Sequence, residues 1–160
     1  MDPSGDIRIE VAGAERVPVV AELLGDFHDH LGKPRPPQAE IEGRVRRVMD
    51  GGDGEFLLGY VDGEPAAVAQ LRWRWAIWTG ALDAWLEDLF VSESRRRSGL
   101  GRAMVRAVME RSRERGCIRL ELDVDVENEG AQALYRSCGF SDEPKSPGGS
   151  MLMGIRVSGG

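Results

Sequence analysis

The segment LEDLFVSESRRRSGLGRAMV, residues 86–105, contains the features that decide the fold. Its first six residues are typical of a strand, and the apolar residues from Leu100 onward recur at helical spacing. Three consecutive arginines, Arg95, Arg96 and Arg97, stand just before that helix in a chain of net charge -6. Arginines at a helix N-terminus oppose the positive end of the helix dipole. We therefore expect an anionic ligand at this junction.

The junction has the composition of a pyrophosphate-binding turn. Glycine lets the backbone approach a ligand closely, free N–H groups at a helix start bind anions, and arginine adds charge-assisted hydrogen bonds. The alternative is a solvated helix start. The turn lacks the lysine and hydroxyl pair of a Walker loop and the spacing of a dinucleotide-binding loop, which argues against both functions. The expected cradle consists of Arg96, Arg97, Ser98, Gly99, Leu100 and Gly101.

Charge is distributed unevenly along the chain. From Arg95 to Arg119 there are nine arginines and two acids, whereas the whole chain has 27 acidic and 21 basic residues. An acidic chain with a pI near 5.0 would repel a long phosphate backbone elsewhere, so we expect a small polyphosphate ligand and no nucleic-acid partner. The N-terminal residues contain no apolar leader or membrane span, which predicts a cytoplasmic protein without a membrane partner.

Apolar periodicity predicts one α/β domain over residues 1–160, with an ordered core at 7–157. An Asp-Gly pair at 62–63 indicates a hairpin between two strands. The expected strands are 7–12, 55–61, 65–75, 84–91, 117–126, one beginning at 139–140, and 151–157; the expected helices are 14–31, 38–49, 99–115 and 128–138. The order β-α-α-β-β-β-α-β-α-β-β predicts a mixed, mostly antiparallel sheet of about seven strands flanked by about four helices.

The opening segment, followed by Asn128, Ala131, Tyr135 and the Gly-Phe pair at 139–140, resembles the GNAT superfamily of acetyl-coenzyme A-dependent N-acetyltransferases. The resemblance is close over about residues 84–140 and extends to most of the chain through element order. It implies a GNAT-like fold, a homodimer, and acetyl transfer by direct attack in a ternary complex. It also implies that acetyl-coenzyme A, with coenzyme A as product, is held by the cradle together with Arg102, by the backbone of Leu89, Phe90 and Val91, and by Asn128 and Tyr135.

Acetylation of an amine needs a proton acceptor, because an alkylammonium has a pKa of about 10.4. Regular alternation along 84–91 places Glu87 on the same face as Leu89 and Val91, the face of the cofactor channel. Together with the resemblance, this predicts that Glu87 is the general base, acting directly or through water. The alternative is an exposed strand charge or a partner for an arginine.

Tyr135 lies on the inward face of its expected helix, where the resemblance places the general acid that protonates the departing thiolate. The alternative is a core tyrosine whose hydroxyl bonds to a backbone carbonyl. Asn128 is expected to cap the same helix and to touch the cofactor.

The segment RWRWAIWTGALDAWLEDLFV, residues 72–91, resembles the spermidine/spermine and thialysine branch of the family, the diamine acetyltransferases. This resemblance favours a small cationic amine, such as a polyamine or a lysine analogue, as acceptor. Aromatic faces and carboxylates attract cations, so we expect substrate contacts from Trp78, Trp85 and Asp88. The alternative is that the tryptophans pack on a strand and its turn.

His28 and His30 stand two residues apart on an expected helix, so they point to different faces and predict no metal site. His28 lies in the region that borders the acceptor site in GNAT enzymes, which makes it a substrate-contact candidate; a solvated helix end is the alternative. Cys117 and Cys138 form no metal-binding pair.

Three other functions fit the same sequence features. Aminoglycoside acetylation would use the same cofactor and an acidic cleft, and peptide or protein acetylation would need a more open groove. A regulatory module would bind coenzyme A without transferring its acetyl group.

Overall fold

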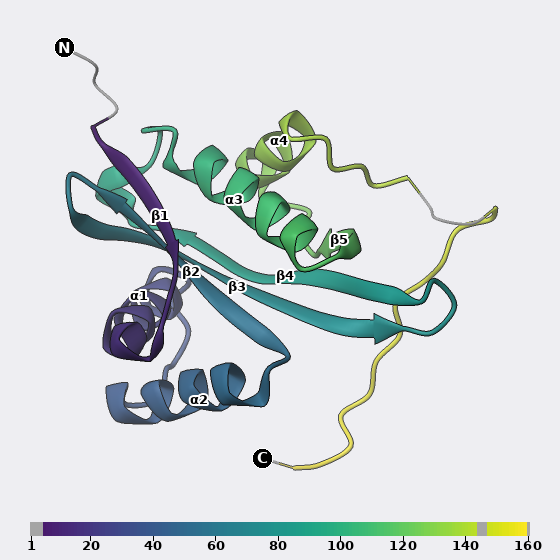
Figure 1. The fold of residues 1–160 in the computed structure, drawn as a ribbon, viewed down its shortest axis with the longest axis horizontal. Helices are drawn as coiled ribbons and strands as arrows, with labels where there is room; N and C mark the ends of the chain where they lie inside the picture. The colour runs from purple at the N-terminus through teal and green to yellow at the C-terminus, as the bar shows by residue number, and fades with distance from the viewer. Residues whose placement is uncertain (1–4, 144–146, 160) are drawn as a thin grey trace.

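The structure is a computed structural model that describes residues 5–143 and 147–159. Helices and strands alternate along the chain much as the apolar periodicity predicts (Figure 1). The elements are β1 (Ile7–Val11), η1 (Ala14–Arg16), α1 (Val17–His30), α2 (Gln38–Gly51), β2 (Gly54–Val61), β3 (Glu64–Ala76), β4 (Ala81–Val91), η2 (Glu93–Arg95), α3 (Leu100–Glu114), β5 (Cys117–Leu122) and α4 (Glu129–Ser137).

The strands form one mixed sheet in the order β1-β2-β3-β4-β5. The first four strands pair antiparallel, and β5 runs parallel to β4 because α3 carries the chain back between them. The hairpin between β2 and β3 turns at Asp62 and Gly63, whose φ angles of 50° and 81° are those that a tight hairpin turn requires. The predicted α/β fold, its mixed sheet and its four α-helices are confirmed.

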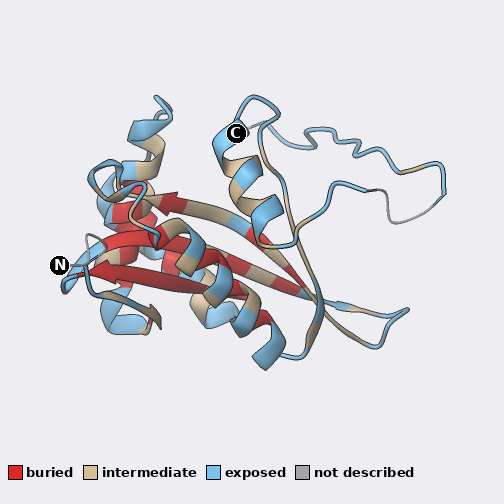
Figure 2. Cartoon of the chain, turned by 90° about the horizontal axis from the view of Figure 1, so that it is seen from above, coloured by how far each residue is buried: buried red, intermediate tan, exposed pale blue. Residues whose placement is uncertain are grey.

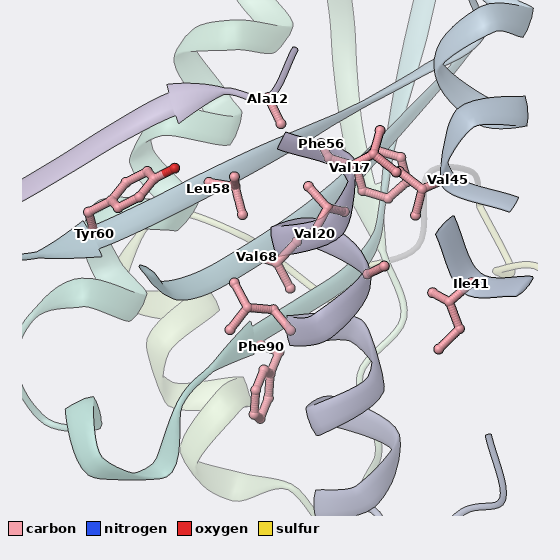
Figure 3. Close-up of a cluster of buried hydrophobic side chains, with 12 residues drawn as sticks. Ala12, Val17, Val20, Ile41, Val45, Phe56, Leu58, Tyr60, Val68 and Phe90 are labelled. Atoms are coloured by element: carbon pink, nitrogen blue, oxygen red, sulfur yellow. The ribbon is translucent and has the colours of Figure 1, made fainter. Parts of the chain in front are cut away.

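Two helical layers cover the sheet, with α1 and α2 on one face and α3 and α4 on the other (Figure 1). Figure 2 shows that the buried residues concentrate in the sheet and in the helix faces turned toward it. On the first face α1 and α2 pack on the strands through the apolar cluster in Figure 3, which includes Val17, Val20, Phe56, Val68 and Phe90. In the described part of the chain, no helix is both long enough and apolar enough to cross a bilayer.

The C-terminal region differs from the prediction. The described residues form five strands rather than seven: β5 ends at Leu122 instead of 126, and neither 139–140 nor 151–157 is a strand. The second segment has the alternating pattern of a strand, but its apolar residues are 83–90% exposed. A strand needs a partner ladder as well as a pattern. No neighbouring strand pairs with this segment among the described residues, so it stays extended and uncovered.

Candidate active site

The sheet opens between β4 and β5. The parallel ladder begins at Leu82 with Cys117 and stops at Leu86 with Leu122, whereas β4 continues to Val91. Residues 87–91 still pair with β3 on their other side, apart from the position at Glu87 described below. The backbone groups of this stretch that face β5 therefore lack a ladder partner and are available to an extended ligand.

The predicted anion-binding turn lies directly beyond this opening. Arg97 and Gly99 adopt left-handed backbone conformations, with φ of 63° and 87°, and α3 begins at the next residue. The N–H groups of Gly101 and Arg102 have no hydrogen-bond partner among the described residues. Two free amides at the positive end of a 15-residue helix form a ready anion site.

The arginines of the turn have different tasks. Arg96 donates from Nε to the Val91 carbonyl at 3.1 Å, which fastens the turn to the end of β4. Arg97 and Arg102 have exposed side chains at the start of α3. The two amides and these two exposed cations suit an anionic group such as a pyrophosphate, while Arg96 positions the turn.

The helix α4 lies against the same place. A side chain at Gly101 would come within 3.4 Å of Leu134 on α4 and 3.9 Å of Val91 on β4, so α4 borders the cradle. Asn128 caps α4 by accepting a hydrogen bond from the Ala131 N–H at 3.1 Å, which confirms the predicted cap.

Tyr135 is partly buried against the apolar cluster on the α3 side of the sheet. Burial raises the pKa of the Tyr135 phenol above its ordinary value, so the hydroxyl keeps its proton at neutral pH. Among the described residues nothing hydrogen-bonds to that hydroxyl, so the alternative of a phenol bound to a backbone carbonyl is not observed there.

A β-bulge at Glu87 reverses the predicted facing of β4. Gln70 of β3 pairs with Asp88, and the next pair is Leu71 with Leu86, so Glu87 is an extra residue without a partner. Leu89 and Val91 pack on the α3 side, whereas Glu87 shares a cleft with Trp85 on the α1/α2 side. The prediction that Glu87 shares a face with Leu89 and Val91 is therefore wrong, because it assumed unbroken alternation. Glu87 and Asp88 instead lie on the same face.

Asp88 faces a cavity of about 180 Å³ between α1, α2 and the sheet. Burial raises the pKa of the Asp88 carboxyl, the negative charge of Glu87 raises it further, and His28 acts in the opposite direction. No described side chain hydrogen-bonds to Asp88 or forms an ion pair with it. The structure thus brings together Glu87, Asp88 and His28, three of the predicted site residues.

Glu87 is exposed in an adjoining cleft of about 570 Å³. Trp85 lines the same cleft, together with four carboxylates, Asp53, Asp83, Glu87 and Glu121, and two arginines, Arg72 and Arg74, so its wall is aromatic and carries more negative than positive charge. Such a wall attracts cations. Leu152, from the C-terminal segment, also borders the cleft.

Trp78 does not join the other candidates. It lies at the tip of the hairpin between β3 and β4 with 97% of its surface exposed, and it lines none of the cavities just described. Conversely, the sequence interpretation missed Arg35 and Gln70, both of which line the Asp88 cavity. Nothing in the sequence distinguishes Gln70 from other polar residues of a strand. For Arg35 there was an indirect signal: Gly25 lies inside α1, and a glycine within a helix often leaves space for a neighbouring group, here the Arg35 guanidinium.

Comparison with known proteins agrees with this geometry. Residues 19–140 match the acetyltransferase (GNAT) family. An aminoglycoside N(6')-acetyltransferase type 1 from Stenotrophomonas maltophilia is 32% identical over 75% of this chain and 74% of its own. A thialysine N-epsilon-acetyltransferase from Caenorhabditis elegans is 31% identical over 79% of this chain and 80% of its own.

Among solved structures, a putative acetyltransferase from Arthrobacter sp. FB24 superposes with a TM-score of 0.81 at 31% identity, covering 93% of this chain and 94% of the other. Enzymes of the GNAT family take their acetyl group from acetyl-coenzyme A, which the unpaired strand edge and the cradle fit. The chain is therefore a member of the GNAT family, an acyl-coenzyme A-dependent N-acetyltransferase.

Proposed function

We propose that this enzyme acetylates the primary amine of a small cationic molecule by direct attack within a ternary complex. The observation that carries the proposal is the bulge at Glu87, which places two adjacent carboxylates on one face of β4. They lie where β4 has separated from β5, so an acceptor held by them is close to a donor held by the strand edge.

The donor side is formed by backbone. Acetyl-coenzyme A, when bound, supplies the acetyl thioester. The exposed backbone of Leu89, Phe90 and Val91 would hold its extended arm. The amides of Gly101 and Arg102, with the side chains of Arg97 and Arg102, would hold its pyrophosphate. Further contacts would come from Ser98, Gly99, Leu100, Asn128 and Tyr135.

The acceptor side is acidic along β4. Asp83, Glu87 and Asp88 follow one another along β4, at about 3.3 Å of strand rise per residue, with Trp85 between them. Carboxylates attract an ammonium group, and an indole ring adds a cation–π contact when a cation lies over it. This arrangement supports a slender, positively charged acceptor.

The carboxylate pair also serves the chemistry. Deprotonating an alkylammonium at neutral pH costs on the order of 4 kcal/mol, so the site needs a proton acceptor. Burial and a neighbouring negative charge both make Asp88 a better base than an exposed aspartate, and Glu87 beside it meets the incoming ammonium group. Tyr135, whose phenol stays protonated, gives a proton to the departing sulfur.

A second acceptor class has support of its own. The relative from Stenotrophomonas maltophilia is an aminoglycoside acetyltransferase, and the 570 Å³ acidic cleft is large enough for more than a single amine arm. The thialysine relative and the smaller Asp88 cavity favour the slender acceptor.

The experiment is thiol release from acetyl-coenzyme A by the purified enzyme, with polyamines, lysine analogues, aminoglycosides and peptides as separate acceptors. We expect turnover with small linear amines to exceed turnover with the other groups. Preference for aminoglycosides or peptides would overturn the acceptor assignment. Binding of coenzyme A measured by calorimetry, together with silence across all acceptors, would instead indicate a coenzyme A-binding module.

A further inference from the structure

The cavity that reaches Asp88 carries charges of both signs on its walls. Asp88 and Gln70 come from the sheet, while Arg35 comes from the connection between α1 and α2, and Arg44 comes from α2. The wall between these groups is apolar: Leu24, Phe27, Pro36, Ile41, Val45, Val48 and Phe56. An acceptor inside would therefore meet an anion, a hydrocarbon wall and a cation.

The two kinds of charge come from different walls of the cavity. Burial raises the pKa of the Asp88 carboxyl, Glu87 beside it on β4 raises that pKa further, and His28 on α1 lowers it. Arg35 and Arg44 border the cavity from the helical side, whereas Asp88 borders it from the sheet.

The guanidinium of Arg35 packs on α1 at Gly25. A side-chain carbon at Gly25 would lie 1.7 Å from Nη1 of Arg35, so the guanidinium packs directly on the helix backbone at this glycine. Glycine inside a helix destabilises the helix relative to alanine. The glycine is explained by the space that the guanidinium needs.

Much of the Arg35 fork remains open. Its Nε lies 3.3 Å from Asp29, which orients the group, while its two terminal nitrogens have no hydrogen-bond partner among the described residues. Arg44 is ion-paired with Glu40 on its own helix. A guanidinium with two free terminal nitrogens suits a carboxylate, which it can bind through two parallel hydrogen bonds.

We infer that Arg35 binds a carboxylate of the acceptor while the acceptor's amine lies at Asp88. The acceptor is then an amino acid with a second amine at the end of its side chain, rather than a simple diamine. This inference rests on the proposed function, because it describes the other end of the same acceptor. The cavity suits such a molecule: roughly 150 Å³ accommodates benzene, whereas sites for drug-sized ligands occupy about 300–1,000 Å³.

The test uses acceptors that differ in the carboxylate alone. Lysine and cadaverine share an aminopentyl chain, as ornithine and putrescine share an aminobutyl chain, and lysinamide keeps both amines of lysine without its carboxylate. We expect kcat/KM for lysine to exceed that for cadaverine and lysinamide by about tenfold or more, the scale of one charge-assisted contact.

Two variants locate the effect. R35Q should reduce the lysine to cadaverine ratio of kcat/KM about tenfold, and G25A should do the same by displacing the guanidinium while leaving α1 at least as stable. R47Q, on the exposed face of α2, is the matched control and should keep the wild-type ratio.

The outcomes separate the two proposals. Equal kcat/KM for lysine, lysinamide and cadaverine, or a wild-type ratio in both R35Q and G25A, overturns the carboxylate site and leaves small-amine acetylation standing. No turnover with any of these amines overturns both.

Discussion

Asp88 pairs with Gln70 across the β3–β4 ladder, and the residue before it, Glu87, pairs with nothing. This single irregularity puts two carboxylates on one side of a strand, where regular alternation would have separated them. The pair lies where β4 separates from β5, beside the strand edge that would hold the acetyl donor.

Replacing Asp88 tests proton acceptance. Asp88→Asn should lower kcat by about 10²-fold or more, the range of general base catalysis, with little change in acetyl-coenzyme A affinity. In the wild type, activity should fall as the pH drops through the raised pKa of Asp88, because only the ionised carboxylate accepts a proton. The residual activity of the variant should lack this acidic limb, as measured by initial rates across pH.

Glu87→Gln is the companion variant. It should also lower turnover while leaving coenzyme A binding intact, and it should retain the acidic limb that Asp88 produces. Loss of the limb in Glu87→Gln but not in Asp88→Asn would reverse the two roles.

Asp88 should also weaken the fold at neutral pH. Its folded-state pKa is raised, so protonation favours the folded state, and this stabilisation is lost as the pH rises through the folded-state pKa. Asp88→Asn should therefore unfold at higher temperature than the wild type at pH 7. The difference should disappear well below the unfolded pKa of about 3.9, where the Asp88 side chain of the wild type is uncharged in both the folded and the unfolded state. Thermal denaturation at both pH values measures this.

Tyr135→Phe should separate chemistry from packing. The hydroxyl has no hydrogen-bond partner among the described residues, so its removal should change the free energy of unfolding by less than about 1 kcal/mol. Turnover should fall about tenfold or more if the phenol protonates the leaving thiolate. Single-turnover rates and urea denaturation give the two readings; unchanged rates would leave Tyr135 a packing residue.

Gly59 on β2 allows α3 to pack closely on the sheet. An added side-chain carbon would lie 2.8 Å from the Met104 sulfur and 3.1 Å from Leu100, which begins the helix of the cradle. Gly59→Ala should reduce the free energy of unfolding by about 1–3 kcal/mol and weaken coenzyme A binding, as measured by urea denaturation and calorimetry. Gly43→Ala, an exposed helical position with open space around it, is the control and should be neutral or stabilising.

Local chemistry made much of this fold predictable. The Asp62–Gly63 turn and Gly99, just before α3, demand backbone conformations that few other residues adopt, so their positions could be read directly. The same holds for the Asn128 cap. These features depend on a few neighbouring residues, which a sequence displays in full.

The errors concern relationships between distant segments. The sequence around Glu87 contains no sign of a bulge, because the bulge arises from a mismatch of one residue between β3 and β4. Likewise, Met151, Met153, Ile155 and Val157 alternate as a strand does, yet 83–90% of their surface is exposed because a pattern does not supply a partner. Arg35 was missed because its relation to Gly25 crosses from a connection to a helix.

The register on either side of Glu87 is that of a strand one residue shorter. Leu86 and Asp88 already point to opposite faces, as neighbours in a regular strand do, so every buried side chain would keep its place without residue 87. A carboxylate of this kind can therefore enter or leave a lineage through insertion or deletion of one codon, with no reorganisation of the core. The catalytic groups of such a sheet can change through the length of one strand, without substitution of any other residue.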